Sequence, residues 1–102
     1  MKKQICIVNP NTTASMTKLI DVTAKKYAGV NTEIITTQPQ IGPESIEGYY
    51  DEAFSIPGLV EEILKNKNAD AFVIACFDDT GLDALRSITD KPVIGIGEAA
   101  YH

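Results

Sequence analysis

The sequence predicts an α/β domain with a four-stranded, parallel, doubly wound sheet of the flavodoxin-like kind, and three observations predict it. Short apolar runs typical of buried strands alternate with longer stretches whose apolar residues recur at helical spacing. Glycine, proline or asparagine stands near most of the boundaries between these stretches, as turns require. Such alternation is typical of βαβ units, in which the strands are parallel and the crossovers right-handed.

The first predicted strand covers residues 4–8, and a turn over residues 9–13 follows at its carboxyl end. The helix that comes next has lysines in its last turn and ends before Gly29. Its apolar stripe consists of Met16, Leu19, Ile20, Ala24 and Tyr27. Residues 32–37 are rich in β-branched side chains and polar at both ends, so we expect a strand at the edge of the sheet.

Residues 38–56 show no clear period and contain several glycines and prolines, so we expect a long loop. Loops of this length in compact domains are usually functional or disordered, although a plain connector, or a helix starting near Tyr50, is an open alternative. Pro57 is expected in the first turn of the following helix, because its missing N–H is not needed there.

Residues 71–75 are apolar throughout, which predicts a central strand covered on both faces. Cys76 stands where this strand ends, and Asp78 and Asp79 follow as candidate N-caps of a helix over residues 79–89. Ligands of parallel sheets bind outside the carboxyl ends of the strands. We therefore expect Cys76 at the mouth of a site, beside a helix N-terminus.

Two opposing effects act on the equilibrium between the thiol and the thiolate of Cys76. Free amide hydrogens and the helix dipole favour a thiolate, whereas the two aspartates that follow disfavour a further negative charge. An inert, buried cysteine is the alternative, because free cysteine is among the most buried residue types. Cys6, which lies between two isoleucines inside the first strand, is expected to be such a core residue.

Residues 93–96 predict a fourth strand after Pro92, and a helix is expected to begin at Gly97. That helix is cut at its first turn, so one face of the sheet would lack its cover. We expect residues 1–102 to form a single α/β domain that belongs to a longer protein or pairs with another chain.

Composition excludes several classes of function. The net charge of −5 disfavours a nucleic-acid surface, and no apolar run approaches the roughly 20 residues of a membrane span. The two cysteines have no paired spacing, which favours a reducing, cytoplasmic compartment over a disulfide framework or a zinc site. Residues 95–100 match a glycine-rich dinucleotide fingerprint only weakly, because they follow the last strand. His102, the only histidine, is interpreted as a solvated chain end.

Several motifs together resemble the N-terminal half of the Asp/Glu/hydantoin racemase family, most closely its hydantoin and allantoin racemase branch. They are residues 9–13 (NPNTT) with Met16 and Thr17, residues 42–48 (GPESIEG), residues 51–53 (DEA), residues 75–79 (ACFDD) with Gly81 and Leu82, and residues 92–100 (PVIGIGEAA). Thr80 departs from the pattern, because proline is expected after the two aspartates.

The resemblance implies an isomerase that needs no cofactor and has two similar halves, each contributing one catalytic cysteine, of which Cys76 is the first. One thiolate removes the proton beside a carbonyl, and the opposing thiol protonates the other face. The resemblance also implies substrate-binding residues in the turns and the long loop: Asn11, Ser45, Ile46, Phe77, Asp78 and Thr80. The expected substrates are 5-substituted hydantoins or a related amide such as allantoin.

Three alternatives stay open: malonate decarboxylation or maleate isomerisation in the same superfamily, a non-catalytic domain that binds a small ligand, and a nucleotide-binding domain. The expected partners are a small molecule and further copies of the chain, not nucleic acid or membrane. The second cysteine is absent and Cys6 lies within a strand, so these 102 residues alone should not racemise. Two copies facing each other across a two-fold axis could instead bring two Cys76 thiols together.

Overall fold

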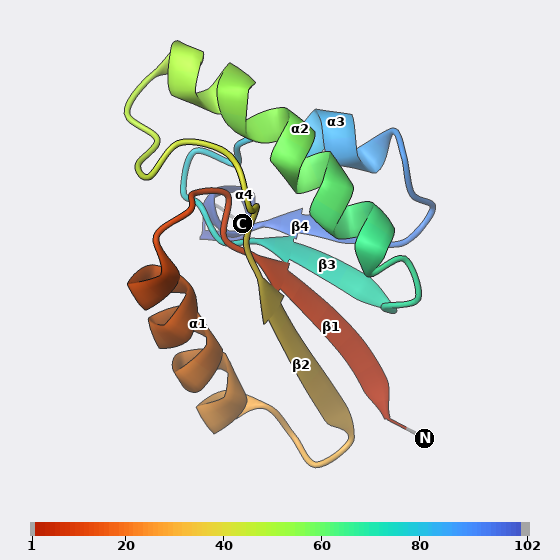
Figure 1. Cartoon of the computed structure of the whole chain (residues 1–102). Helices are drawn as coiled ribbons and strands as arrows, with labels where there is room; N and C mark the ends of the chain where they lie inside the picture. The colour runs from red at the N-terminus through yellow and green to blue at the C-terminus, as the bar shows by residue number, and fades with distance from the viewer. Residues whose placement is uncertain (1, 101–102) are drawn as a thin grey trace.

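The computed structural model describes residues 2–100, whose four strands form one parallel sheet in the order β2-β1-β3-β4 (Figure 1). The strands are β1 (Lys3–Val8), β2 (Thr32–Thr37), β3 (Ala71–Ile74) and β4 (Val93–Gly95). The helices are α1 (Ala14–Tyr27), α2 (Tyr49–Lys65), α3 (Leu82–Arg86) and α4 (Ile96–Ala100). The predicted parallel α/β sheet is confirmed, with β2 at an edge and the carboxyl ends of β1, β3 and β4 side by side.

One face of the sheet carries α2 and α3, and α1 lies on the opposite side (Figure 1). Side chains alternate along the strands, so Cys6, Val8, Phe72 and Ile74 all join the buried cluster beneath α2 and α3. The helices add Leu59, Ile63, Leu82 and Leu85 to this cluster. The prediction that Cys6 belongs to the core is confirmed, because its side chain is 0% exposed.

The opposite face is less well covered, and this corrects the expectation that β3 is buried on both faces. Ala71 and Val73 point to this side and are only half-buried, whereas Phe72 and Ile74 are buried. Helix α1 contributes no buried residue. An apolar groove of about 330 Å³ therefore remains between α1 and the sheet, with Ile7 and Val73 in its floor.

The second helix begins before Pro57, close to the alternative start near Tyr50. It starts at Tyr49, so Pro57 lies inside the helix and not in its first turn. An interior proline removes one helical hydrogen bond, but burial of Leu59 and Ile63 within the next two turns stabilises the helix. The rings of Tyr50 and Phe54 stack across one turn at 6.3 Å between centroids, which supports the part before the proline.

The third helix is much shorter than the predicted range of residues 79–89, and neither predicted aspartate caps it. It covers only Leu82–Arg86, and its N-cap is Gly81 in the left-handed conformation (φ 75°). The Asp79 side chain turns away instead, and its carboxylate accepts the N–H of Gly97 in α4 at 2.9 Å. Asp79 therefore joins the turn after β3 to the first turn of the last helix.

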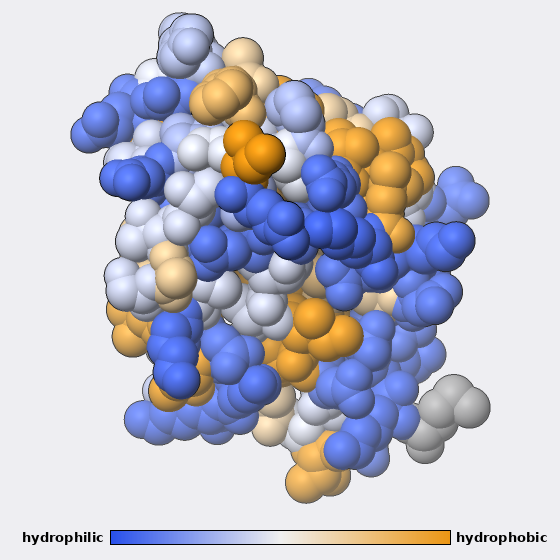
Figure 2. Space-filling view, in the orientation of Figure 1, coloured by the Kyte–Doolittle hydropathy of each residue, from blue (hydrophilic) through white to orange (hydrophobic). Residues whose placement is uncertain are grey.

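Apolar side chains on the face shown in Figure 2 form separate groups divided by hydrophilic side chains. The side chains of Tyr49 and Tyr50 at the start of α2 are exposed. Within residues 2–100, no helix combines the length and the apolar character that crossing a bilayer requires.

Candidate functional site

A groove of about 370 Å³ opens at the carboxyl ends of β1 and β3, where the sequence predicts the site. It brings together five of the predicted site residues: Asn11, Ser45, Ile46, Cys76 and Phe77. The rest of its lining consists of Asn9, Pro10, Met16, Ile20, Ala75 and Ile96. Of these, Met16 and Ile20 belong to the apolar stripe of α1, whereas the other stripe residues, Leu19, Ala24 and Tyr27, do not line this groove.

The turn after β1 is held rigid by the buried side chain of Asn9. Its amide nitrogen donates to Oδ1 of Asn11 and to Oγ1 of Thr17, both at 3.0 Å. Oδ1 of Asn11 also accepts the backbone N–H of Thr13 at 2.9 Å. The oxygen of Asn11 is thus used within the turn, which leaves its Nδ2 group, 3.6 Å from the Met16 sulfur, as the donor on the groove side.

The long loop before α2 is tied to this turn, and the tie places Ser45 and Ile46 in the groove wall. The N–H of Thr12 donates to the carbonyl oxygen of Pro43 at 2.9 Å. The hydroxyl of Thr13 donates to the carbonyl oxygen of Glu44 at 2.8 Å. Segments about 30 residues apart in the sequence are therefore held against each other by one backbone and one side-chain hydrogen bond.

Cys76 is partly exposed, lines the groove and lies in a tight turn. The N–H of Asp79 donates to the carbonyl oxygen of Cys76 at 3.0 Å. The helix that follows this turn begins only at Leu82, later than the predicted start at Asp79. The nearest polar side-chain partner that the sulfur has in the structure is the hydroxyl of Thr80, at 3.5 Å.

The glycines of the weak dinucleotide fingerprint have a packing role. A Cβ atom on Gly97 would lie 2.0 Å from the carbonyl oxygen of Phe77, and one on Gly95 would lie 2.1 Å from Oδ1 of Asp79. These glycines let the Cys76 turn lie directly against β4 and α4. The Phe77 side chain itself is 74% exposed at the rim of the groove.

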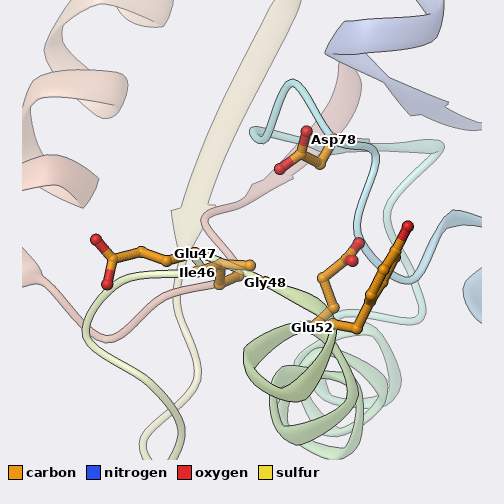
Figure 3. Close-up of a pocket in the computed structure, with 6 residues that line it drawn as sticks. Ile46, Glu47, Gly48, Glu52 and Asp78 are labelled. Atoms are coloured by element: carbon orange, nitrogen blue, oxygen red, sulfur yellow. The ribbon is translucent and has the colours of Figure 1, made fainter.

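The remaining predicted residues lie beside the groove, not in it. Asp78 lines a neighbouring open pocket of about 400 Å³ together with Glu47 and Glu52. In Figure 3 the Glu52 side chain extends from α2 toward the turn that carries Asp78, whereas the Glu47 side chain points away. Thr80 is 1% exposed, and its hydroxyl lies between the Cys76 sulfur and Oε1 of Glu52.

The sequence patterns assign no role to Glu52, although Glu52 lies within residues 51–53, one of the motifs that resemble the racemase family. Its position in the first turn of α2 is favourable for a carboxylate, because the helix dipole is positive there. No signal in the sequence alone pairs it with Thr80, because 28 residues separate the two.

The other cysteine has a different environment. Burial and, to a smaller extent, the charge of Glu62 raise the pKa of Cys6 from 9.0 to about 11. Glu62 is itself buried and accepts a hydrogen bond from the hydroxyl of Thr37. Cys6 is therefore a protonated core residue that does not face the groove. Over residues 2–100, no three His, Cys, Asp or Glu side chains gather as metal ligands do.

Comparisons with known proteins agree with this geometry. The family profile for Asp/Glu/Hydantoin racemase matches residues 5–102. The hydantoin racemase of Pseudomonas sp. (strain NS671) is 52% identical over 101 residues, which are 97% of this chain and 41% of that protein. The hydantoin racemase of Rhizobium meliloti is 46% identical over 98 residues, covering 94% of this chain and 41% of that protein.

Among solved structures, the allantoin racemase from Klebsiella pneumoniae superposes with a TM-score of 0.91 at 42% identity, over 97% of this chain and 41% of that one. The chain thus spans about two fifths of the length of the proteins it matches. A profile match over nearly all residues, together with high identity and a shared fold, shows descent and not only a common architecture. The chain belongs to the Asp/Glu/hydantoin racemase family.

Proposed function

We propose that this chain is the N-terminal half of a racemase that acts on 5-substituted hydantoins or on a related amide such as allantoin. The observation that carries the proposal is Cys76, a partly exposed thiol in a groove at the carboxyl end of an inner strand. Relatives named as hydantoin racemases and allantoin racemases support the substrate class.

The proposed chemistry is proton exchange at a carbon that adjoins a carbonyl group. The thiolate of Cys76 takes the proton from C5 of the hydantoin ring, and the electron pair of the broken C–H bond moves into the adjacent carbonyl. A thiol on the opposite face then donates its proton to C5, and the carbonyl is restored. The ring carbonyl accepts the charge of the carbanion, so this chemistry requires no cofactor.

The groove supplies neutral polar groups and an apolar wall. The side-chain amide of Asn11 is a candidate donor to a substrate carbonyl, and Ser45 adds a hydroxyl group. Ile46 and Met16 would pack against the substituent at C5. Phe77 and Asp78 would act through the backbone of the Cys76 turn. This combination suits an uncharged ring better than a phosphorylated ligand.

The second thiol of the proposed reaction must come from outside these residues, because Cys6 is buried in the core. We propose that a second α/β half, or a second copy of the chain related by a two-fold axis, supplies it. With a separate second half, these residues alone are inactive; with a second copy of the chain, only the single copy is inactive and the pair would be active. The two unpaired cysteines favour a reducing compartment such as the cytoplasm.

The test is the decay of the circular dichroism of an L-5-substituted hydantoin, measured with the full-length protein that carries this chain. Cys76→Ala should abolish the decay but retain ligand binding, whereas Cys6→Ala, which removes the other sulfur, should retain activity. Unchanged racemisation by Cys76→Ala would refute the assignment. Binding without turnover by the wild-type protein would favour a non-catalytic binding domain, and turnover of malonates or maleate instead would favour the other superfamily reactions.

A further inference from the structure

The hydroxyl of Thr80 lies between a sulfur and a carboxylate. Its Oγ1 atom is 3.5 Å from Sγ of Cys76 and 3.5 Å from Oε1 of Glu52. Thr80 is buried, whereas Cys76 lines the groove and Glu52 lines the open pocket on the other side. The three side chains therefore connect the groove to solvent through one buried hydroxyl group.

We propose that Thr80 is a positioning residue that forms a hydrogen bond with Cys76 in both of its protonation states. We also propose that Glu52 favours the thiol form of Cys76 over the thiolate. The proposal rests on the proposed function, in which Cys76 alternates between thiolate and thiol in each turnover. A hydroxyl group suits this task because it both donates and accepts hydrogen bonds.

In the thiol state, the S–H group donates to Oγ1 of Thr80, and the hydroxyl donates to the carboxylate of Glu52. In the thiolate state, the hydroxyl rotates and donates to Sγ, while the carboxylate of Glu52 is solvated in its open pocket. The proton that Sγ gains from the substrate carbon is released to solvent before the next turnover in the same direction, or is donated to the substrate carbon in the reverse reaction, and the hydroxyl proton stays on Oγ1 throughout. No further reactant is needed.

The charges near Cys76 determine the direction of the bias. Glu52 on α2, and Asp78 and Asp79 in the turn itself, are negative, and Glu47 lines the same pocket as Glu52. The carboxylate of Asp79 accepts the N–H of Gly97. Arg86 is paired with Glu98, whose hydrogen bond is the main cause of its raised pKa, and the charge of Asp79 contributes least. The groove walls from α1 and from the β4–α4 junction are uncharged: Met16, Ile20 and Ile96.

Glu52 therefore disfavours the thiolate in two ways, because its charge repels the sulfur anion and its oxygen competes for the Thr80 proton. Thr80 acts in the opposite sense, since its hydroxyl, 3.5 Å from Sγ, can donate to the anion. A proline at this position, as the family motif leads one to expect, would have neither the hydroxyl nor its bonds. The two residues should thus shift thiolate formation in opposite directions when each is replaced.

The test is the rate of Cys76 alkylation by iodoacetamide as a function of pH, followed by mass spectrometry of the Cys76 peptide in the full-length protein. Thr80→Val should raise the pH at which the rate is half-maximal, and Glu52→Gln should lower it. Thr80→Ser, the conservative variant, should restore the wild-type profile. Thr80→Val should also lower kcat with little change in KM, because Thr80 does not line the groove.

Midpoints that do not move, or that move in the same direction, would overturn the proposal. If Thr80→Val fails to fold by circular dichroism, Glu52→Gln decides alone, and a midpoint that stays or rises refutes the bias. Alkylation needs no substrate, so this result is separate from the racemase assay. Absence of racemisation in the wild-type protein would refute the proposed function, whereas unmoved midpoints with racemisation intact would refute only the role of Thr80 and Glu52.

Discussion

The close contact between the Cys76 turn and the last helix leads to a quantitative prediction for Gly97→Ala. A Cβ atom at this position would lie 2.0 Å from the carbonyl oxygen of Phe77 and 2.9 Å from its carbonyl carbon. Both are backbone atoms, which cannot move without displacing the turn. Displacement of the turn would also stretch the 2.9 Å hydrogen bond from the Gly97 N–H to Asp79.

The expected loss of stability follows from these two effects. Overpacking costs about 1–3 kcal/mol, and loss of a hydrogen bond to a charged group costs about 1.5–3 kcal/mol. Alanine gains about 1 kcal/mol over glycine inside a helix. We therefore expect Gly97→Ala to lower the free energy of unfolding by about 2–4 kcal/mol, allowing for partial relaxation.

The assay is urea unfolding followed by circular dichroism, in which such a loss lowers the midpoint by about 1–2 M at a slope of about 2 kcal/mol per molar. Gly29→Ala is the matched control, because a Cβ atom there meets nothing within 4 Å. Its stability should change by less than about 0.5 kcal/mol. Alkylation of Cys76 should also change rate in Gly97→Ala, since the turn that holds the sulfur moves.

A companion variant separates backbone clashes from side-chain clashes. A Cβ atom on Gly95 would meet the Asp79 side chain, at 2.1 Å from Oδ1 and 2.5 Å from Cγ. Asp79→Gly should therefore make Gly95→Ala nearly neutral, but it should not rescue Gly97→Ala. The reasoning is refuted if Gly97→Ala stays within about 0.5 kcal/mol of wild type, or if Asp79→Gly rescues both alanine variants equally.

Two further predictions concern the core. Burial raises the pKa of Cys6 from 9.0 to about 11. Between these pH values the folded protein keeps a thiol proton that the unfolded chain loses. The contribution of Cys6 to the free energy of unfolding is therefore fully present below pH 9 and is lost as the pH rises to about 11. Cys6→Ala should show a shallower decline of unfolding free energy over that range, and equal slopes would contradict the shift. Leu59→Ala, at a fully buried site, should cost about 2–5 kcal/mol in urea unfolding. Leu64→Ala on the same helix, 55% exposed, is the control, and similar losses for both would be inconsistent with the core described.

The strands and their roles were predictable because their signals are local. Continuous apolar runs mark β1 and β3 as inner strands, and the polar ends of β2 mark it as an edge. The position of Cys76 at the end of β3 follows from the same pattern. The motifs shared with the racemase family predicted the groove residues Asn11, Ser45 and Ile46 from sequence alone.

Helix boundaries were less predictable, because distant contacts override local preferences. Pro57 suggests a helix start, but α2 extends back to Tyr49, and the part before the proline buries Ser55 and stacks the rings of Tyr50 and Phe54. Asp79 is a residue type that often caps helices, but its carboxylate accepts a hydrogen bond from the N–H of Gly97. The N-cap of α3 is Gly81 instead.

The sequence by itself determined the sheet, the strand that carries the cysteine and the family to which the chain belongs, because periodicity and motifs are properties of neighbouring residues. Only the tertiary structure decided what surrounds the sulfur: the hydroxyl of Thr80, the carboxylate of Glu52 behind it, and the glycines that admit the turn. The physical reason is that, apart from the contact between Cys76 and Thr80 within one turn, these contacts join residues that are far apart in the chain. Their energies depend on distances that exist only after the sheet has formed.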